Sequence, residues 1–548
     1  MSVPGSFAVL RVLWLLAVFD TVFPLDGGML FPRESSSREV KELNGLWHFR
    51  ADRSPKRNEG FERAWYNRSL AEVRGCQKLS TMFLDLLLIS GSLPQHFFCP
   101  VSLPSAPASS SRWLSLPESG SGVVFVVEKN KLMTHRCMQF TSRTTHVQFL
   151  SIRHCCFLWI VGLVRYKVSV NGGGNNTLNV ALIDKDGHRV ASSNKPSGVL
   201  RVVDVKLWWP YLMHENPGYL YSMEVRQHAN VHEGDVYTLP VGIRTVNVTS
   251  TQFLINNKPF YFHGVNKHED SDIRGKGLDW PLMVKDFNLM KWLGANSFRT
   301  SHYPYAEEIL QMCDRHGIVV IDECPGVGIK DIRSFGNASL SHHLVVMDEL
   351  VLRDKNHPSV VMWSVANEPA AELLPAKFYF KTLIKHTKAL DQTRPVTYIT
   401  MTNYDRDQGA PYVDVVCVNS YFSWYRDSGH LEVIPIQLNT HFENWYRKYQ
   451  KPIIQSEYGA DAVDPPVMFS EEYQSALLQS YHDVFDQKRK QYVIGELIWN
   501  FADFMTTQGI FRVVGNKKGI FTRQRQPKAS AFILKRRYWR LANEMFSN

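Results

Sequence analysis

The sequence predicts a multidomain protein that ends in a (β/α)8 barrel and carries a β-sandwich in front of it. Its 548 residues exceed what one barrel needs, so several domains are expected. From about residue 250 onward, apolar strand-like runs alternate with amphipathic stretches, which indicates a parallel sheet with helical connections. Residues 165–249 instead show short alternating runs between Gly, Asn and Asp turns, which is typical of an antiparallel sandwich.

The barrel prediction depends on eight strands separated by helices within residues 250–548, a span that suits one barrel with insertions. The expected strands are residues 261–265, 297–301, 318–322, 360–366, 396–400, 415–420, 453–456 and 497–502. The expected helices include residues 283–292, 306–315, 342–353, 377–389, 437–449 and 471–487. Pro395 and Pro452 stand directly before two of the strands, a position where proline is tolerated.

The N-terminal part is expected to contain a secretory signal and an irregular segment. Residues 1–22 combine Arg11 with a short apolar run, as signal peptides do. Residues 71–164 keep neither a helical nor a strand period and hold five of the eight cysteines, while the other three cysteines read as buried thiols. Four sequons fit a glycosylated protein of the secretory route: Asn67, Asn175, Asn247 and Asn337.

Charge and hydropathy disfavour two classes of partner. The net charge is +10, but the Lys and Arg residues are spread along the chain, whereas nucleic-acid binding needs a clustered basic footprint. After the signal, no apolar run reaches the roughly 18 residues of a membrane span. His263, His268 and His302 lack the spacing of a helical zinc motif, so no metal site is expected.

Two glutamates carry the first indication of chemistry. Glu368 and Glu457 each close an apolar strand-like run, at what are counted as strands four and seven. Side chains at the C-terminal ends of barrel strands carry the chemistry of this fold, and strands four and seven face each other across the mouth. A facing pair about 5 Å apart is the arrangement of a retaining glycosidase. Either glutamate taken alone reads as an exposed loop residue, whereas the pair favours catalysis.

Further strand ends supply polar and aromatic side chains around this pair. Tyr421 follows strand six and can donate a hydrogen bond that keeps a carboxylate ionised, and Arg299 of strand two can do so by its charge. Trp499 can stack on a sugar face or can be a barrel-core residue, and the sequence leaves both open.

Longer strings carry a resemblance to glycoside hydrolase family 2. Residues 296–304, Asn-Ser-Phe-Arg-Thr-Ser-His-Tyr-Pro, resemble its first signature, and residues 354–368 resemble its acid/base signature. Ser-Glu-Tyr-Gly at residues 456–459 and Asn-Lys-Lys-Gly at residues 516–519 are similar to the mammalian lysosomal β-glucuronidase branch of that family.

The resemblance implies an architecture and an activity. It implies a jelly-roll sugar-binding domain within residues 23–164, an immunoglobulin-like sandwich at residues 165–249 and a TIM-barrel catalytic domain at residues 250–548. The implied activity is retaining exo-hydrolysis of β-D-glucuronides, as in lysosomal glycosaminoglycan degradation. The implied enzyme needs no cofactor, assembles as a homotetramer and reaches the lysosome through the secretory pathway.

The resemblance also implies roles for individual residues. Glu368 matches the acid/base, Glu457 the nucleophile and Tyr421 the residue that supports it. Asn516 and Lys518 match the pair that binds the glucuronate carboxylate, and an amide with an ammonium suits a carboxylate better than a hydroxymethyl group. The other positions that match the family's pocket are His302, Asn367, Tyr425, Trp499 and Arg512.

One segment departs from the family. Residues 71–164 match nothing in it and replace most of the jelly roll, as in an alternatively spliced form; the loop after Glu457 is also shorter, and the chain ends early at Asn548. Three hypotheses therefore stand: a β-glucuronidase, a catalytically impaired or binding-only form of one, and another family 2 glycosidase such as a galactosidase or mannosidase. The Asn516 and Lys518 pair argues against the last.

Overall fold

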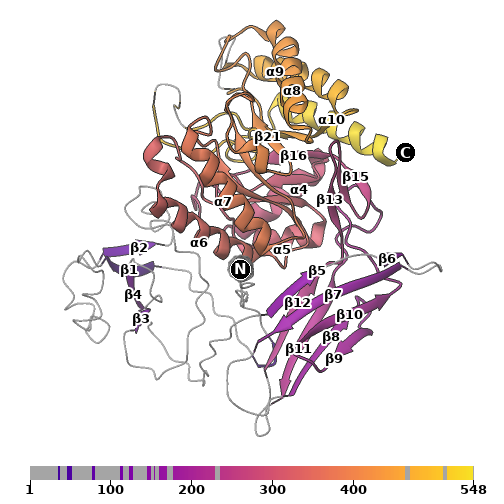
Figure 1. Cartoon of the computed structure of the whole chain (residues 1–548). Coiled ribbons are helices and arrows are strands. Elements are labelled where there is room, and N and C mark those ends of the chain that lie inside the picture. Colours follow the sequence, from indigo (N-terminus) through magenta and orange to yellow (C-terminus); the bar gives the residue numbers. More distant parts are fainter. Residues whose placement is uncertain are drawn as a thin grey trace, which may run out of the picture.

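The computed structural model describes residues 35–37, 160–169, 177–228, 235–462, 469–509, 512 and 515–546, together with the backbone of a few short strands nearer the N-terminus. The expected signal at residues 1–22, the sequons at Asn67 and Asn175, and most of residues 71–164 lie outside these described residues. Figure 1 shows the two described bodies that matter for the site, a barrel with its helices and a set of antiparallel sheets below it.

The barrel is a closed ring of eight parallel strands that follow one another in chain order. Its strands are β16 (Phe262–Asn266), β17 (Ser297–Arg299), β18 (Val319–Glu323), β19 (Val360–Asn367), β20 (Val396–Thr400), β21 (Val416–Asn419), β22 (Ile453–Glu457) and β23 (Val493–Ile498). The connecting helices are α4 (Trp280–Leu293), α5 (Glu307–His316), α6 (Asn337–Asp354), α7 (Leu374–Leu390), α8 (Ile434–Tyr449) and α9 (Glu471–Lys488). This confirms the (β/α)8 barrel predicted from the sequence.

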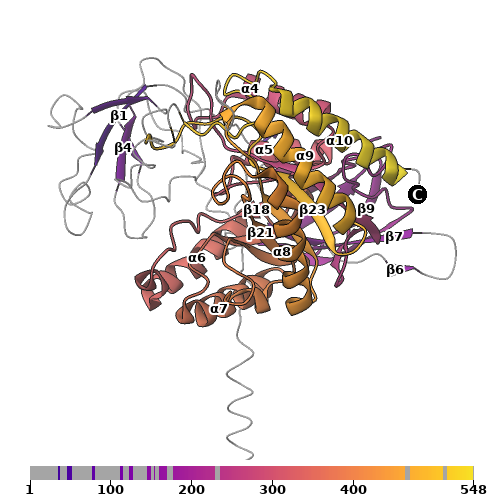
Figure 2. The same ribbon diagram turned by 90° about the horizontal axis from the view of Figure 1, so that it is seen from above.

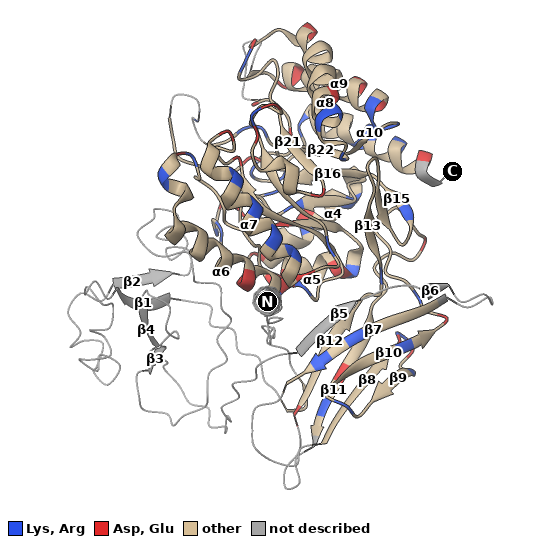
Figure 3. Ribbon diagram, in the orientation of Figure 1, with Lys and Arg blue, Asp and Glu red and all other residues tan. Residues whose placement is uncertain are grey.

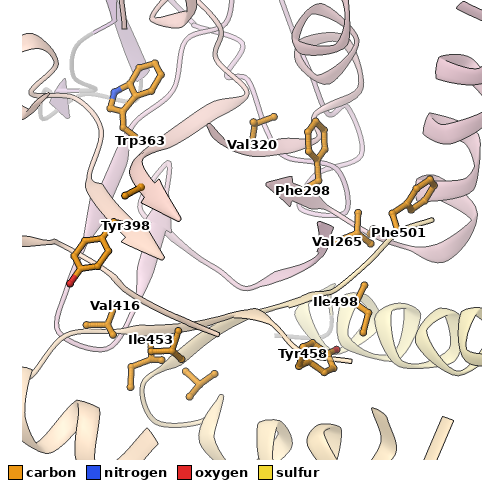
Figure 4. Close-up of a cluster of buried hydrophobic side chains, with 14 of the residues drawn as sticks. Val265, Phe298, Val320, Trp363, Tyr398, Val416, Ile453, Tyr458, Ile498 and Phe501 are labelled. Carbon is orange, nitrogen blue, oxygen red and sulfur yellow. The ribbon is translucent and has the colours of Figure 1, made fainter. Parts of the chain in front are cut away.

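The strands are buried on both faces, because one face meets the helices and the other fills the barrel. Figure 4 shows the outer set, in which side chains from successive strands such as Val320, Trp363 and Ile453 belong to the cluster that the helices cover. Alternate positions on the same strands, including Ile321 and Ile454, join an inner cluster. Side chains alternate across a strand, so this pattern follows directly from the sequence.

The inner cluster closes the end of the barrel at which the strands begin. It continues from the barrel strands into Phe253 and Phe260 of a small antiparallel sheet formed by β13 (Val246–Val248), β14 (Phe253–Ile255) and β15 (Lys258–Phe260). The fully buried Trp208 belongs to the same cluster, and its indole N–H donates to the Asp314 carbonyl at 2.8 Å. With this end packed, the ends at which the strands finish are left to carry the site.

The eighth strand differs from its expected position. Residues 497–502 are predicted as the strand, but β23 spans Val493–Ile498, and residues 499–502 follow it as loop. The cause is Glu496, a charged residue inside the strand that is nonetheless fully buried. Arg537 neutralises it from helix α10 (Ala529–Phe546), with N–O distances of 2.6 and 2.8 Å. This helix is absent from the predicted elements; Figure 2 shows it beside α4 and α9, against which it packs.

Two antiparallel sheets precede the barrel and share one core. One sheet has the order β10-β7-β5, with β10 at Ser197–Val203, β7 at Ile160–Val168 and β5 at Thr145–Phe149, and β6 (Arg153–His154) also pairs with β7. The other sheet has the order β12-β11-β8-β9. The second sheet's strands are β12 (Val236–Val241), β11 (Tyr221–His228), β8 (Thr177–Ile183) and β9 (Arg189–Ser193). Inward residues of both sheets form a single hydrophobic cluster, so the predicted β-sandwich is present. The boundary expected at residue 165 falls inside β7.

A further antiparallel sheet of order β2-β1-β4-β3 lies to the left of the barrel in Figure 1. Its strands are β2 (Gln77–Ser80), β1 (Leu46–Ala51), β4 (Val123–Val127) and β3 (Arg112–Leu114). In the view of Figure 3, basic and acidic residues are interspersed over the described helices. None of the described helices combines the length and apolarity that a membrane span needs.

Candidate active site

The ends of the barrel strands bring most of the expected site residues to one place. Arg299 ends β17, Asn367 ends β19 and Glu457 ends β22, so their positions are fixed by the sheet itself. Glu368 follows β19 directly and Trp499 follows β23. This is the arrangement that the parallel strand pattern predicts.

Glu457 is a buried carboxylate held between two donors. Its Oε1 accepts from Nη1 of Arg299 at 2.8 Å, and its Oε2 accepts from the Tyr421 hydroxyl at 2.6 Å. Burial raises the pKa of Glu457, and the charge of Glu368 adds to that rise, whereas Arg299 lowers it. A carboxylate oriented on both oxygens suits attack on an electrophilic carbon.

Arg299 connects the polar side chains of this site. It is fully buried and its guanidinium contacts side chains at five positions: Asn266, His302, Glu323, Asn367 and Glu457. Burial alone would lower the pKa of Arg299, but Glu323 and Glu457 raise it, so the guanidinium stays charged. Glu323 is the second carboxylate, bound through Nε and Nη2 of Arg299 at 2.8 and 2.9 Å. Burial opposes this ion pair, yet Arg299 keeps the pKa of Glu323 low.

Glu368 has a more open setting than Glu457. Its side chain is 20% exposed against 5% for Glu457, so it can exchange protons with solvent. Oε1 accepts from Nδ2 of Asn419 at 2.8 Å, and the Lys330 ammonium lies 3.7 Å from Oε2. The Glu368 backbone has φ 44°, a left-handed conformation that is uncommon outside glycine and that clusters at functional sites.

A group of packed aromatic rings lies beside Arg299. The His302 ring stacks on Trp499 with centroids 5.1 Å apart and an interplanar angle of 16°. His268 packs edge-on to both rings and lies 4.2 Å from the Phe504 centroid. Trp499 is 6% exposed, so it is largely buried at the mouth.

A second charged group lies next to Glu457. The Lys518 ammonium contacts the Asp461 carboxylate and lies over the Trp424 and Tyr425 rings at 4.7 and 5.0 Å from their centroids. Burial lowers the pKa of Lys518 to about 8, although Asp461 opposes that shift. Arg512 donates to the Tyr425 hydroxyl at 2.8 Å. Tyr425 in turn packs edge-on to Tyr421, centroid to centroid 5.0 Å, which connects this group to the nucleophile candidate.

Asn516 belongs to the same group through the backbone. Its side-chain oxygen accepts from the Lys518 N–H at 3.0 Å, and its main chain pairs with Phe504 in both directions. An amide and an ammonium two residues apart therefore lie on one turn. The strings that carried the resemblance thus meet in space, although residues 516–518 are about 60 positions from Glu457 in the sequence.

Three residues important to the geometry were not among the predicted site residues. Asn266 ends β16 and donates to the Ser456 carbonyl at 2.7 Å, and its position at a strand end was the available signal. Glu323 ends β18, and its position at a strand end was again the available signal. Asp461 follows Glu457 by four residues, and nothing in its local pattern indicates its partner at position 518.

Two of the predicted glycosylation positions fall on described residues. Asn247 and Asn337 are exposed, as a glycosylated side chain must be.

Among the described residues, the grouping that could supply metal ligands is Asp184, Asp186 and His188, in the turn between β8 and β9 of the sandwich. Asp184 Oδ1 there already accepts the backbone N–H groups of Asp186 and His188, at 3.0 and 2.8 Å, so the cluster is accounted for as a turn.

Comparisons with known proteins agree with this geometry. The family model "Glycosyl hydrolases family 2, TIM barrel domain" matches residues 246–543. A beta-glucuronidase of Felis catus is 53% identical over 610 residues, covering 95% of this chain and 94% of that protein. A beta-glucuronidase of Homo sapiens is 50% identical over 611 residues with the same coverage. Both aligned lengths exceed the 548 residues of this chain, so these relatives contain residues that it lacks.

Solved structures give the same similarity in three dimensions. The beta-D-glucuronidase of Dictyoglomus thermophilum superposes with a TM-score of 0.76 at 37% identity, over 93% of this chain and 99% of that one. The b-glucuronidase of Ruminococcus gnavus in complex with D-glucuronic acid superposes with a TM-score of 0.75 at 28% identity, over 94% of this chain and 100% of that one.

Proposed function

The chain belongs to glycosyl hydrolase family 2, and we propose on that premise that it hydrolyses β-D-glucuronides with retention of configuration. The observation that carries this is the buried Glu457, held by Arg299 and Tyr421, with the charge of Glu368 acting on it. Similarity to beta-glucuronidases at about half identity over 95% of the chain supports the glucuronide as substrate.

In the first step, an oxygen of Glu457 forms a bond to the anomeric carbon while the bond from that carbon to the leaving oxygen breaks. Glu368 gives its proton to the leaving oxygen, so the aglycone departs as an alcohol. In the second step, water attacks the anomeric carbon, Glu368 takes the water proton, and the bond to Glu457 breaks. The two donors on Glu457 suit both steps, because they orient the carboxylate and accommodate its charge when it is released.

Lys518 and Asn516 are proposed to bind the carboxylate of the sugar, with Arg512 and Tyr425 beside them. The support is that a buried ammonium and an amide lie together next to Glu457, a setting in which a charge-assisted hydrogen bond is strong. His302, Asn367 and Trp499 are proposed to line the remainder of the sugar pocket. A galactoside or mannoside has a hydroxymethyl group at this position and would offer the ammonium no charged partner on the sugar.

The finer assignments rest on the family. We assign the sandwich at residues 165–249 to the immunoglobulin-like type, and residues 23–164 to an incomplete jelly roll whose aberrant part is 71–164. The aligned lengths of the relatives exceed the length of this chain, which supports a loss of chain relative to them. Assembly as a homotetramer, glycosylation at the four sequons, action on glycosaminoglycan ends and delivery to the lysosome are proposed on the same basis. A catalytically impaired form is the competing proposal, favoured by that same loss of chain.

Chemical rescue separates the two glutamates. The full chain is incubated with 4-nitrophenyl β-D-glucuronide, with and without azide, as wild type, Glu457→Ala and Glu368→Ala. Both variants are expected to lose at least about a thousandfold in kcat. Azide replaces the missing group, so Glu457→Ala should yield the α-glucuronyl azide and Glu368→Ala the β-glucuronyl azide.

The pattern of products decides between the proposals. The same azide anomer from both variants would refute the separate roles. A folded wild type that binds glucuronide without turning it over would support the impaired form instead. Glu372→Ala, which removes a glutamate four residues beyond Glu368, is the matched control and should retain activity.

A further inference from the structure

Asp461 stands between the nucleophile strand and the segment that carries Lys518. It follows the end of β22 by four residues and is 4% exposed. Its Oδ1 accepts the backbone N–H of Lys517 at 2.9 Å, and the Ala462 N–H donates to the Lys517 carbonyl at 3.0 Å. The residues after Glu457 are thereby attached to the residues around Lys518, so Asp461 is placed to relate one group to the other.

The side chain of Asp461 meets two cations. Its Oδ2 contacts the Lys518 ammonium and lies 3.2 Å from Nη1 of Arg512. Lys518 is fully buried, and its other neighbours are the rings of Trp424, Tyr425 and Tyr421. Rings attract an ammonium weakly compared with a carboxylate, so Asp461 is the main group that offsets the cost of burying this charge.

Asp461 contacts two cations among the described residues, Lys518 and Arg512. The Lys518 ammonium can take a further anionic partner, and a sugar carboxylate supplies one. A neutral hydroxymethyl group supplies no charge and would bind more weakly.

We propose that Asp461 is a positioning residue that keeps Lys518 charged and aimed, and so sets the selectivity of the pocket for one carboxylate. This inference rests on the proposed function, since it assigns the sugar carboxylate to Lys518. The role differs from contact with substrate, because Asp461 repels an anion directly and favours it only through Lys518.

The pH dependence follows from the groups that face Lys518. Those are Asp461 and Glu457, which favour its charge, Arg512, which opposes it, and the hydroxyls of Tyr421 and Tyr425, whose own pKa values are raised by burial. With Asp461 present, the pKa of Lys518 is about 8, so glucuronide binding weakens above that pH. Without Asp461, burial and Arg512 lower the pKa further, and the same weakening begins at a lower pH.

The test is Asp461→Asn in the full chain, with 4-nitrophenyl β-D-glucuronide and the matched β-D-glucoside as probes from pH 4.5 to 9. For the glucuronide, KM at pH 7 should rise about tenfold over wild type, with a smaller change at pH 5 and a smaller change in kcat. The glucoside lacks the charge, so its pH profile should not shift. Glucuronide profiles that are parallel in the variant and the wild type would overturn the inference.

A double-mutant cycle with Lys518→Met covers the case of poor folding. If Asp461 acts through Lys518, adding Asp461→Asn to Lys518→Met should cause no further loss of glucuronide over glucoside selectivity. If Asp461→Asn alone unfolds while the double variant folds, the uncompensated ammonium is the cause, which supports the inference. Unfolding of both would make Asp461 a structural anchor and overturn it. A wild type that fails to cleave the glucuronide overturns the proposed function, and this inference with it.

Discussion

At the scale of single residues, the neighbours of Glu457 determine whether its carboxylate is charged. Burial favours the protonated form of Glu457, whereas hydrogen bonds from Arg299 and Tyr421 favour the ionised form. Tyr421 is one of them, and its pKa is itself raised by burial and by Glu457, so the hydroxyl retains its proton and continues to donate. The proposed nucleophile therefore depends on a hydrogen bond between a neutral donor and a charged acceptor, a kind that contributes about 1.5–3 kcal/mol.

Replacing Tyr421 with Phe tests that dependence. We expect kcat on a glucuronide to fall by about 10- to 100-fold, because one donor to the ionised carboxylate is lost. Loss of the donor also raises the pKa of Glu457 further, so the acid limb of the kcat/KM profile should move to higher pH. The measurement is a pH–rate series on the purified chain. The control is Tyr446→Phe, because the Tyr446 ring stacks on Tyr492 with centroids 3.9 Å apart. If the acid limb does not move in Tyr421→Phe, the proposed role of the Tyr421 hydroxyl is wrong.

At the scale of elements, most of the barrel strands from β16 to β22 could be predicted because they contain runs of apolar residues, as β18 and β19 do. Their observed bounds differ from the expected ones by one or two residues at most ends. β23 could not be placed, because Gly495 and Glu496 interrupt its apolar pattern. The burial of Glu496 is explained by its ion pair with Arg537, which lies 41 positions further along the chain. Tyr261 also contacts this ion pair, because its hydroxyl donates to Glu496 at 2.8 Å.

Breaking this ion pair measures how far α10 supports the barrel. Arg537→Met leaves the Glu496 charge buried with only Tyr261 as a side-chain donor. We expect the free energy of unfolding to fall by about 3–5 kcal/mol, the range for removal of one partner of a buried pair. Arg540→Met on the same helix removes a half-exposed guanidinium and should cost less than about 1 kcal/mol. Urea unfolding followed by tryptophan fluorescence makes the comparison, and equal losses would show that Glu496 is not the determinant.

At the scale of the whole molecule, sequence strings far apart become one site because a closed barrel brings every strand end to the same mouth. That rule made the positions of Glu368, Tyr421 and Glu457 predictable from the order of the strands. It says nothing about loops that return to the mouth from further along the chain. The pairing of Asp461 with Lys518 spans 57 positions and could not be inferred from either local pattern.

The N-terminal region contains residues 71–164, whose sequence keeps no regular pattern. The relatives align over more positions than this chain has residues. The proposed acid, the proposed nucleophile and their donors all come from residues of the barrel domain. We therefore expect the barrel chemistry to operate in this chain as it stands.

A trapped glycosyl-enzyme tests that claim most directly. A 2-deoxy-2-fluoro-β-D-glucuronyl fluoride reacts with the nucleophile of a retaining glycosidase and hydrolyses slowly, so the covalent intermediate accumulates. We predict a single label on the full chain, found by mass spectrometry of its peptides on Glu457 and missing from Glu457→Gln. A label on another carboxylate, or an unlabelled chain that still cleaves glucuronides, would contradict the account.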